Sequence, residues 1–240
     1  MKTEILTKKN GKALNGFSIE DIGDDHLFTS LDTPMKPGAF DISDKEKKER
    51  ISILFSEIMD VLGLDLTDDS LQGTPDRVAK MYIEEIFSGL DPKNKPKIAL
   101  FDNKYQYNQM LVEKDITFYS NCEHHFVPII GKAHVAYISS GKVIGLSKLN
   151  RIVELFGRRG AIQEQLTSAI HNAVGKITEG NRGVIVTIVG THNCVSCRGV
   201  KHQGAAMVTT KASGVFRDNN NLSRKEFFDS LKINNGGHNI

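Results

Sequence analysis

Residues 116–145 read ITFYSNCEHHFVPIIGKAHVAYISSGKVIG, and this stretch decides the fold. It contains three short runs rich in β-branched and aromatic residues, at 116–118, 133–138 and 143–145. Such runs are typical of strands, and the segment 139–142 between the last two predicts a hairpin. The stretch therefore predicts that a sheet begins near residue 116.

Further elements are predicted downstream of this stretch. Apolar residues recur every three or four positions over 146–156 and over 162–177, with a break at 159–160, which predicts two helices. An apolar run at 184–189 predicts another strand, and 208–211 predicts one more. The two helices are expected to lie over the sheet.

Helix start signals occur before and after the sheet. Ser43–Glu46 has the capping-box spacing, and an apolar stripe follows it to Gly63. Thr74-Pro75 predicts an N-cap with proline at the first helical position, followed by a stripe that continues to Gly89. Ser223–Glu226 is predicted to cap a short final helix.

The composition suits a globular chain. It has 240 residues, of which 39% are hydrophobic and 25% are charged, with a formal net charge of +2. Such a small charge does not indicate a nucleic-acid or membrane partner. No apolar run approaches the roughly 20 residues that a membrane helix needs, and the N-terminus lacks a signal-peptide core, so a cytoplasmic location is expected.

The chain is expected to divide into an extension and one domain. Residues 1–40 show no sustained hydrophobic period and are predicted to be an N-terminal extension. Residues 41–240 are predicted to form the domain. Within it, 41–110 is expected to be helical, and 111–240 is expected to be the metal-containing catalytic part.

A dense group of metal-binding residue types follows the first predicted strand. Cys122-Glu-His-His125 places one thiol and two imidazoles within four positions. Zinc prefers thiolate and imidazole ligands, and this spacing lets Cys122 and His125 hold one ion. Cys194 follows the strand predicted at 184–189 and can supply a third ligand. Three ligands leave one position for water, which is the arrangement of a catalytic site.

A closed structural zinc site is the alternative. Cys194 and Cys197 have the spacing of a zinc knuckle, so the Cys197 thiolate would be a fourth ligand and complete the tetrahedron with Cys122, His125 and Cys194. His124 and His192 favour the catalytic interpretation, because imidazole exchanges protons near neutral pH and a structural site needs no extra histidines.

A helix start with basic residues predicts an anion site. Ser147 lies near the predicted N-cap, and Lys148 and Arg151 lie in the first turns. Free backbone N–H groups and the helix dipole attract phosphate at such a start. The alternative is a solvated basic face, and Arg77 and Arg198 would join an anion site only if the fold brings them near.

Gln163-Glu164 begins the next predicted helix. A carboxylate here can accept hydrogen bonds from N1–H and the amino group of guanine, a donor edge that adenine lacks. The alternative is an exposed glutamate in the first turn of a helix, which is common.

These motifs, in this order, resemble the GTP cyclohydrolase I family in its bacterial form. The similarity runs from about residue 50 through the final helix and includes Thr74-Pro-x-Arg77. It implies an α+β tunnelling fold, in which an antiparallel sheet carries helices on one face. It also implies that subunits join into a toroidal barrel, a homodecamer with sites between subunits.

The resemblance implies a role for each motif residue. Zinc is implied to be held by Cys122, His125 and Cys194. Proton transfer is implied for His124 and His192, with Ser147 against the ribose or phosphates. Guanine recognition is implied for Gln163 and Glu164. The triphosphate is implied to be bound by Arg77, Lys148, Arg151 and Arg198.

The implied reaction is a zinc-dependent hydrolysis of the guanine ring of GTP. It releases formate and forms 7,8-dihydroneopterin triphosphate, the first step of tetrahydrofolate and pterin biosynthesis and so of one-carbon metabolism. The chain departs from the family at 161–167, where Ala-Ile-Gln-Glu-Gln-Leu-Thr replaces Gln-Val-Gln-Glu-Arg-Leu-Thr. Guanine affinity is therefore expected to differ.

Two other functions remain open from the sequence. One is a different tunnelling-fold enzyme that acts on a pterin or a deazaguanine. The other is a noncatalytic protein that binds GTP or is stabilised by zinc. Release of formate from GTP would distinguish the cyclohydrolase from both.

Overall fold

The computed structural model describes residues 33–217 and 222–233. Most of the predicted extension, 1–40, lies outside these residues. The described elements, in chain order, are α2 (Asp44–Val61), α3 (Thr74–Met81), the π-helical η1 (Tyr82–Ile86), the 3-10 helices η2 (Ser88–Leu90) and η3 (Pro92–Asn94), β1 (Leu100–Asp102), β2 (Met110–Asn121), β3 (Pro128–Ile138), β4 (Lys142–Ile144), α4 (Leu146–Gly157), α5 (Gln163–Ile177), β5 (Gly183–His192), α6 (Asn193–Ser196), β6 (Met207–Ala212), the 3-10 helix η4 (Gly214–Phe216) and α7 (Leu222–Leu231).

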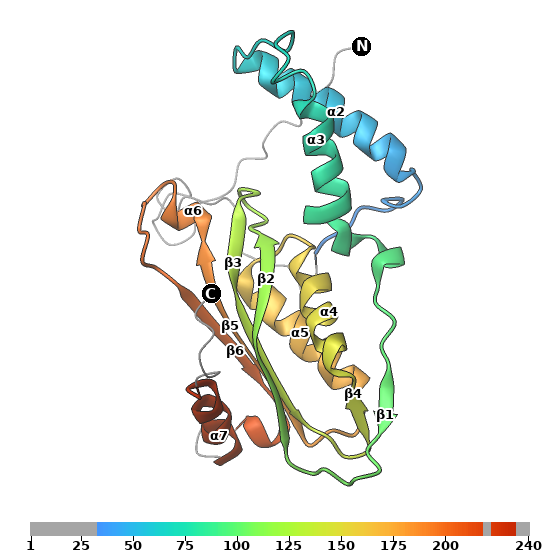
Figure 1. Cartoon of the computed structure of the whole chain (residues 1–240), viewed down its shortest axis with the longest axis vertical. Helices are drawn as coiled ribbons and strands as arrows, with labels where there is room; N and C mark the ends of the chain where they lie inside the picture. The colour runs from blue at the N-terminus through green and yellow to red at the C-terminus, as the bar shows by residue number, and fades with distance from the viewer. Residues whose placement is uncertain (1–32, 218–221, 234–240) are drawn as a thin grey trace, which may run out of the picture. The chain divides into compact units, whose positions relative to one another are not determined.

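The main sheet is antiparallel and has the strand order β2-β3-β5-β6 (Figure 1). The ladder between β2 and β3 runs from the pair Met110–Ile138 to the pair Asn121–Pro128. Each predicted strand of this sheet is present, and β2 and β3 are longer than predicted. The fold is therefore a mixture of helices and an antiparallel sheet, as predicted.

The predicted hairpin between 133–138 and 143–145 is wrong. β4 pairs with β1 in a separate two-stranded sheet, because β2 and β5 already occupy both edges of β3. The Ser139 hydroxyl donates to the Lys142 carbonyl oxygen at 2.7 Å in the connecting turn. Strand β1 was not predicted, although Ile98-Ala-Leu-Phe101 is an apolar run, and its three residues are exposed.

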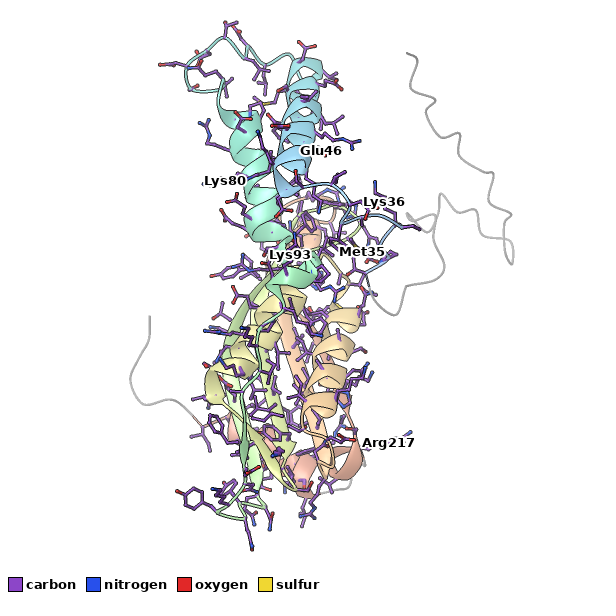
Figure 2. The ribbon with its side chains drawn as sticks, turned by 90° about the vertical axis from the view of Figure 1, so that its right-hand side faces the viewer. Met35, Lys36, Glu46, Lys80, Lys93 and Arg217 are labelled. Carbon is purple, nitrogen blue, oxygen red and sulfur yellow. The ribbon has the colours of Figure 1, made fainter. Side chains whose placement is uncertain are left out.

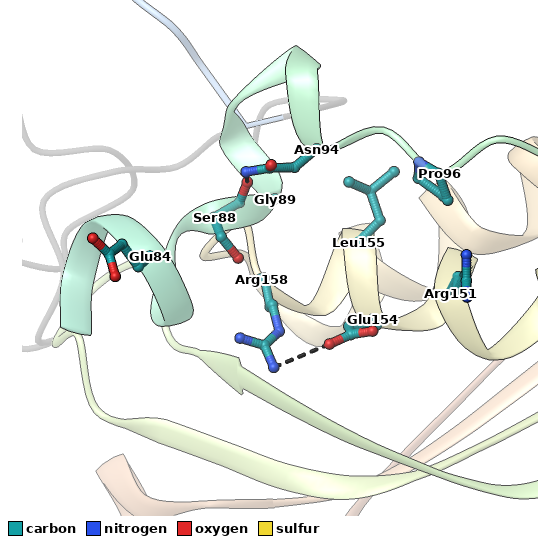
Figure 3. Close-up of a pocket in the computed structure, with 9 residues that line it drawn as sticks. All are labelled: Glu84, Ser88, Gly89, Asn94, Pro96, Arg151, Glu154, Leu155 and Arg158. Atoms are coloured by element: carbon teal, nitrogen blue, oxygen red, sulfur yellow. Dashed lines mark hydrogen bonds and ion pairs between the residues drawn. The ribbon is translucent and has the colours of Figure 1, made fainter. Parts of the chain in front are cut away.

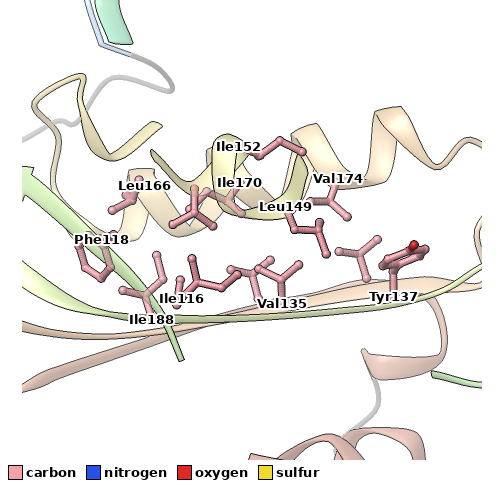
Figure 4. Packing of buried hydrophobic residues seen from close by; sticks show 14 of the residues in the cluster. Ile116, Phe118, Val135, Tyr137, Leu149, Ile152, Leu166, Ile170, Val174 and Ile188 are labelled. Atoms are coloured by element: carbon pink, nitrogen blue, oxygen red, sulfur yellow. The ribbon is translucent and has the colours of Figure 1, made fainter. Parts of the chain in front are cut away.

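Helices α4 and α5 cover one face of the main sheet, as predicted. Their apolar stripes pack on β2, β3 and β5 (Figure 4). Each such buried side chain contributes roughly 1.5–3 kcal/mol relative to an exposed one. Residues of this core include Ile116, Phe118, Val135, Tyr137, Leu149, Ile152, Leu166, Ile170, Val174 and Ile188.

A second, smaller core lies on the opposite face of the sheet. Phe227 of α7 and Phe216 of η4 pack there against Ala136, Ile138 and Ile185. The expectation of helices on one face therefore describes α4 and α5 but not α7. Helix α7 begins at Leu222, so Ser223 lies within its first turn rather than at the predicted N-cap.

The helices before the sheet begin close to the predicted positions. Ser43 is the N-cap of α2, and its hydroxyl accepts from the Glu46 N–H at 3.2 Å, as predicted. The N-cap of α3 is Gly73 rather than Thr74. Figure 2 shows Glu46 on α2 and Lys80 on α3. Among the described residues, no helix has the length and apolar character that a membrane span requires.

Candidate metal centre and substrate site

A tight turn between β2 and β3 carries the first two predicted metal ligands. The Cys122 N–H donates to the Val127 carbonyl oxygen, and the Phe126 N–H donates to the Cys122 carbonyl oxygen, both at 2.9 Å. Phe126 has a φ of 56°, in the left-handed region that few residues other than glycine adopt. The segment 122–126 is called the metal turn below.

Strand β5 brings the third predicted ligand to the same end of the sheet. In the ladder between β3 and β5, Ile129 pairs with His192, so β5 ends beside the metal turn. The chain then enters the short helix α6, which carries Cys194. The ligand atoms of Cys122, His125 and Cys194 all lie within 4.8 Å of one another. The structure therefore brings the three predicted ligands together.

The chemistry of this cluster fits zinc. Two thiols and one imidazole are ligands that zinc prefers, and three protein ligands leave a fourth tetrahedral position for another molecule. Burial raises the pKa of the Cys194 thiol, and the neighbouring Cys122 raises it further. A bound cation would have the opposite effect and favour the thiolates.

Cys197 does not belong to this group among the described residues. Its side chain is exposed, and its Sγ donates to the Asn193 carbonyl oxygen at 2.9 Å. The alternative of a structural site with four ligands therefore gains no support from the described geometry.

His192 is oriented by the buried side chain of Gln163. The distance from His192 Nε2 to Gln163 Oε1 is 2.9 Å. The Gln163 amide nitrogen donates to the Ile188 and Met207 carbonyl oxygens and to the Thr209 hydroxyl at 3.0–3.2 Å. Gln163 Oε1 must therefore be the acceptor, so His192 carries a proton on Nε2, and Nδ1 of the neutral ring is an acceptor.

The electrostatic surroundings of the two extra histidines differ. Burial lowers the pKa of His192, and the negative charge of Glu164 partly offsets this effect. His124 is exposed, and its Nε2 lies 3.5 Å from a Glu123 carboxylate oxygen. Both imidazoles lie on segments that also carry candidate metal ligands.

The two residues predicted to recognise guanine face different surroundings. The Gln163 side chain is 1% exposed and points into the sheet. Glu164 is exposed at the same helix start. The guanine contact predicted for Gln163 gains no support from its side-chain hydrogen bonds, whereas Glu164 is available to a ligand near His192.

The predicted anion site lies at the start of α4, with Ser147, Lys148 and Arg151 in the first turns after the N-cap Gly145. Helix α4 begins next to β4, at the end of the sheet opposite to the metal turn (Figure 1).

The register of the sheet gives the separation between the two ends. Asn150 of α4 donates to the Glu113 carboxylate of β2, and Glu113 pairs with Val135. The metal turn begins after the pair Asn121–Pro128, seven residues away along β3. At roughly 3.3 Å per residue, the separation is about 23 Å. Lysine and arginine side chains are much shorter than this, so within one chain the basic residues of α4 do not reach the metal cluster.

A pocket of about 390 Å³ lies between α4 and the segment η1–η3 (Figure 3). Arg151 and Arg158 line it together with Glu84 and Glu154. Arg158 and Glu154 form an ion pair at 3.0 Å. Glu84 is paired with Lys48 of α2 at 2.7 Å, so each glutamate that lines the pocket has a cationic partner.

The remaining predicted arginines lie in different parts of the chain. Arg198 is exposed and follows α6, and its positive charge lowers the pKa of Cys194, so it lies at the metal end of the sheet. Arg77 of α3 donates to the Ser70 carbonyl oxygen and the Thr74 hydroxyl, at 3.1 Å and 2.9 Å.

Two residues that shape the site were missed from the sequence. One is Gln163 as the partner of His192, and the other is Asn121, whose amide donates to the Phe126 carbonyl oxygen. A signal for the first exists at Gly190, because a Cβ there would lie 2.5 Å from Gln163 Oε1. Glycine inside a strand often marks such a close approach.

Comparison with known proteins gives consistent matches over most of the chain. The family described as GTP cyclohydrolase I matches residues 51–232. A GTP cyclohydrolase 1 from Flavobacterium johnsoniae is 49% identical over 215 residues, which cover 90% of this chain and 95% of the relative. The protein of the same name from Vibrio parahaemolyticus is 50% identical over 202 residues, or 84% and 91% of the two chains. The one from Citrobacter koseri is 46% identical over 205 residues, or 85% and 91%.

Proposed function

This chain belongs to the GTP cyclohydrolase I family, and we propose that it hydrolyses the guanine ring of GTP to release formate and form 7,8-dihydroneopterin triphosphate. The observation that carries this proposal is the cluster of Cys122, His125 and Cys194, whose ligand atoms lie within 4.8 Å of one another. His192 and Glu164 lie at the same end of the sheet, beside that cluster.

We assign zinc as the cofactor because two thiols and one imidazole fit it best. When bound, zinc supplies Lewis acidity that makes water reactive near neutral pH. Cys122, His125 and Cys194 would hold it. The exposed side of the cluster at His125 leaves room for substrate to approach.

His192 is suited to transfer a proton to or from the substrate. Gln163 Oε1 accepts a hydrogen bond from Nε2–H of His192, which fixes the ring orientation and leaves Nδ1 as the reactive nitrogen. The lowered pKa of His192 keeps the ring neutral at physiological pH, so Nδ1 can take up a proton from a reacting group. His124 is the second candidate for proton transfer.

Glu164 is suited to recognise guanine. Its carboxylate is exposed at the start of α5, and a carboxylate accepts hydrogen bonds from both donors on the guanine edge. We propose that Gln163 acts on the reaction mainly through His192.

The triphosphate-binding residues support a site shared between subunits. Lys148 and Arg151 lie about 23 Å along the sheet from the metal turn, by the strand spacing. A second subunit can place its own α4 start beside the metal end of the first. Ser147, Arg77 and Arg198 would complete the phosphate contacts, with each residue supplied by whichever subunit is nearest.

Exposed surfaces of the subunit support assembly into a ring. Strands β2 and β6 are the edges of the four-stranded sheet, and edges of this kind pair with other chains unless they are protected. Helix α2 exposes Ile58, Val61 and Leu62, an apolar surface of the kind that contacts other chains. We propose the toroidal homodecamer of the tunnelling fold.

The test is release of formate from GTP by the purified protein, with the product followed by its pterin absorbance. Formate and the dihydropterin should form in equal amounts, and a zinc chelator should abolish both. GTP that remains intact with zinc-loaded protein would refute the function, while a different pterin-like product would indicate another tunnelling-fold enzyme.

A further inference from the structure

Asn121 is a buried residue whose side chain bridges the two ends of the metal turn. It is the last residue of β2, directly before the ligand Cys122, and it is 7% exposed. Its side-chain Nδ2 donates a 2.8 Å hydrogen bond to the Phe126 carbonyl oxygen. Because Phe126 directly follows His125, this bond adds a side-chain link to the two backbone hydrogen bonds that close the segment with two of the three proposed metal ligands.

The left-handed backbone of Phe126 explains why the turn needs such a bond. A φ of 56° is unfavourable for a phenylalanine, so the conformation persists only where surrounding contacts enforce it. The Asn121 amide holds the carbonyl group of this residue. The same conformation sets the direction in which the chain leaves His125.

Aromatic packing holds the turn from the outside. The centroid of the Phe126 ring lies 5.2 Å from that of Phe87, which in turn lies 5.6 Å from Tyr82. Gly160 leaves space for this contact, since a Cβ there would lie 2.8 Å from the Phe87 ring. The ring contacts hold the side chain of Phe126, whereas the Asn121 amide and the Cys122 carbonyl oxygen hold its backbone.

The backbone of Asn121 also connects the metal turn to the substrate side of the site. Its carbonyl oxygen accepts from the Ala161 N–H at 3.1 Å. Ala161 lies two residues before Gln163, which orients His192. One buried residue therefore links the segment that carries the metal ligands to the start of α5.

We propose that Asn121 is a positioning residue that holds the metal turn in its ligand-binding conformation. This inference rests on the proposed zinc-dependent function. Residues that orient metal ligands typically affect metal affinity or activity by 10–100-fold when they are replaced. Loss of the Asn121 amide should therefore weaken zinc retention and slow turnover, while GTP binding through Glu164 and the phosphate contacts is largely kept.

The test uses the assembled, zinc-loaded enzyme and the variant Asn121→Leu, which removes the donor without adding charge. Transfer of zinc to a chelating indicator dye should be about tenfold faster than in the wild type, or more. The kcat should fall by a similar factor of about ten, while KM for GTP stays within about threefold. Asn121→Asp, which keeps the side-chain shape but cannot donate, should behave in the same way.

The matched control is Asn181→Leu. The Asn181 amide also donates to backbone carbonyl oxygens, those of Gly175 and Thr178 at 3.2 Å and 2.9 Å, but at the opposite end of α5. The Asn181→Leu variant should lower the midpoint of thermal unfolding and leave the rate of zinc transfer to the dye unchanged.

Zinc transfer at the wild-type rate in both Asn121 variants would overturn the proposal. Equal acceleration by Asn181→Leu would also overturn it, because the effect would then reflect general destabilisation. If Asn121→Leu does not fold, Asn121→Asp decides on the same measurement, and failure of both to fold would assign Asn121 to folding alone. The dye assay contains no GTP, so absence of formate release would refute the function without deciding this test.

Discussion

Cys194 and Cys197 lie three residues apart, but their sulfur atoms have different surroundings. Cys194 belongs to the metal-binding group, whereas the exposed Cys197 donates its S–H to the Asn193 carbonyl oxygen. A fourth protein ligand would also close the position that water needs in a catalytic zinc site. The two cysteines should therefore respond differently to the same substitution.

We expect Cys197→Ser to retain one zinc per subunit and turnover within about twofold of the wild type, because serine keeps a donor for the Asn193 carbonyl oxygen. Cys194→Ser should lose most of its zinc and nearly all turnover, since a hydroxyl is a poor zinc ligand. Metal content by atomic emission, with formate release measured in parallel, checks both. Loss of zinc from the reduced Cys197→Ser protein would instead support the structural site with four ligands.

The sequence was sufficient to predict which three residues form the candidate metal cluster but not the residues that hold them in place. Cys122, His125 and Cys194 have a spacing and residue types that few other functions require, and the structure brings them together. The role of Gln163 depends on which side of α5 faces the sheet. Asn121 donates to the Phe126 carbonyl oxygen, and this contact exists only once the turn has folded.

Strands and helices with strong apolar patterns were predicted well, and pairings between them were not. β5 and the two helices over the sheet lie where the patterns predict them. The prediction of a hairpin between β3 and β4 was wrong. A pattern of residue types does not show that β2 and β5 already occupy both edges of β3. The bulge in β2, between Glu113 and Ile116, also left no signal in the sequence.

This bulge links β2 to a buried histidine of β3. Asp115 has a φ of 60°, and its N–H donates to Nδ1 of His134 at 3.1 Å. Burial lowers the pKa of His134, with the charge of Asp115 acting against this effect and those of Lys114 and Lys132 adding to it. Protonation of Nδ1 would remove the acceptor that the bulge uses.

The pKa of His134 predicts how stability depends on pH. The pKa is lower in the folded state than the ordinary value of about 6.5, so the unfolded state binds more protons below that value. This contribution to the free energy of unfolding is therefore complete above about pH 6.5 and declines as the pH falls below it. Urea unfolding of the metal-free protein between pH 7.5 and pH 5.5 should show the decline.

His134→Asn is the informative variant, because the asparagine oxygen can accept from the Asp115 N–H and does not titrate. It should reduce the dependence of stability on pH in this range. Part of the dependence should remain, since burial also lowers the pKa of His171. Equal pH slopes for the variant and the wild type would show that the bulge does not respond to His134 titration.

At the scale of the whole molecule, the predicted substrate residues divide into two groups at opposite ends of the sheet. Glu164, His192 and the metal cluster lie at one end, and Lys148 and Arg151 lie near the other. The sequence could not show this division. Between the metal turn and the start of α4, the chain runs the length of β3 to the other end of the sheet. If both groups bind the same GTP, as we propose, a single subunit presents two separate halves of the site.

We expect two inactive variants to restore activity when their subunits are mixed. Cys122→Ser lacks the metal half of the site, and the double variant Lys148→Ala/Arg151→Ala lacks the phosphate half. Co-expression with different tags gives mixed oligomers, in which about a quarter of the sites combine an intact metal half with an intact phosphate half if subunits assort at random. Formate release at limiting GTP should therefore reach about a quarter of the wild-type rate.

Oligomers that mix Cys122→Ser with Cys194→Ser should stay inactive, because both variants damage the same half. Mixed oligomers that are no more active than their parents would show that one subunit supplies both halves of each site. In that case, α4 would have to move along the sheet to bring Lys148 and Arg151 near the metal cluster.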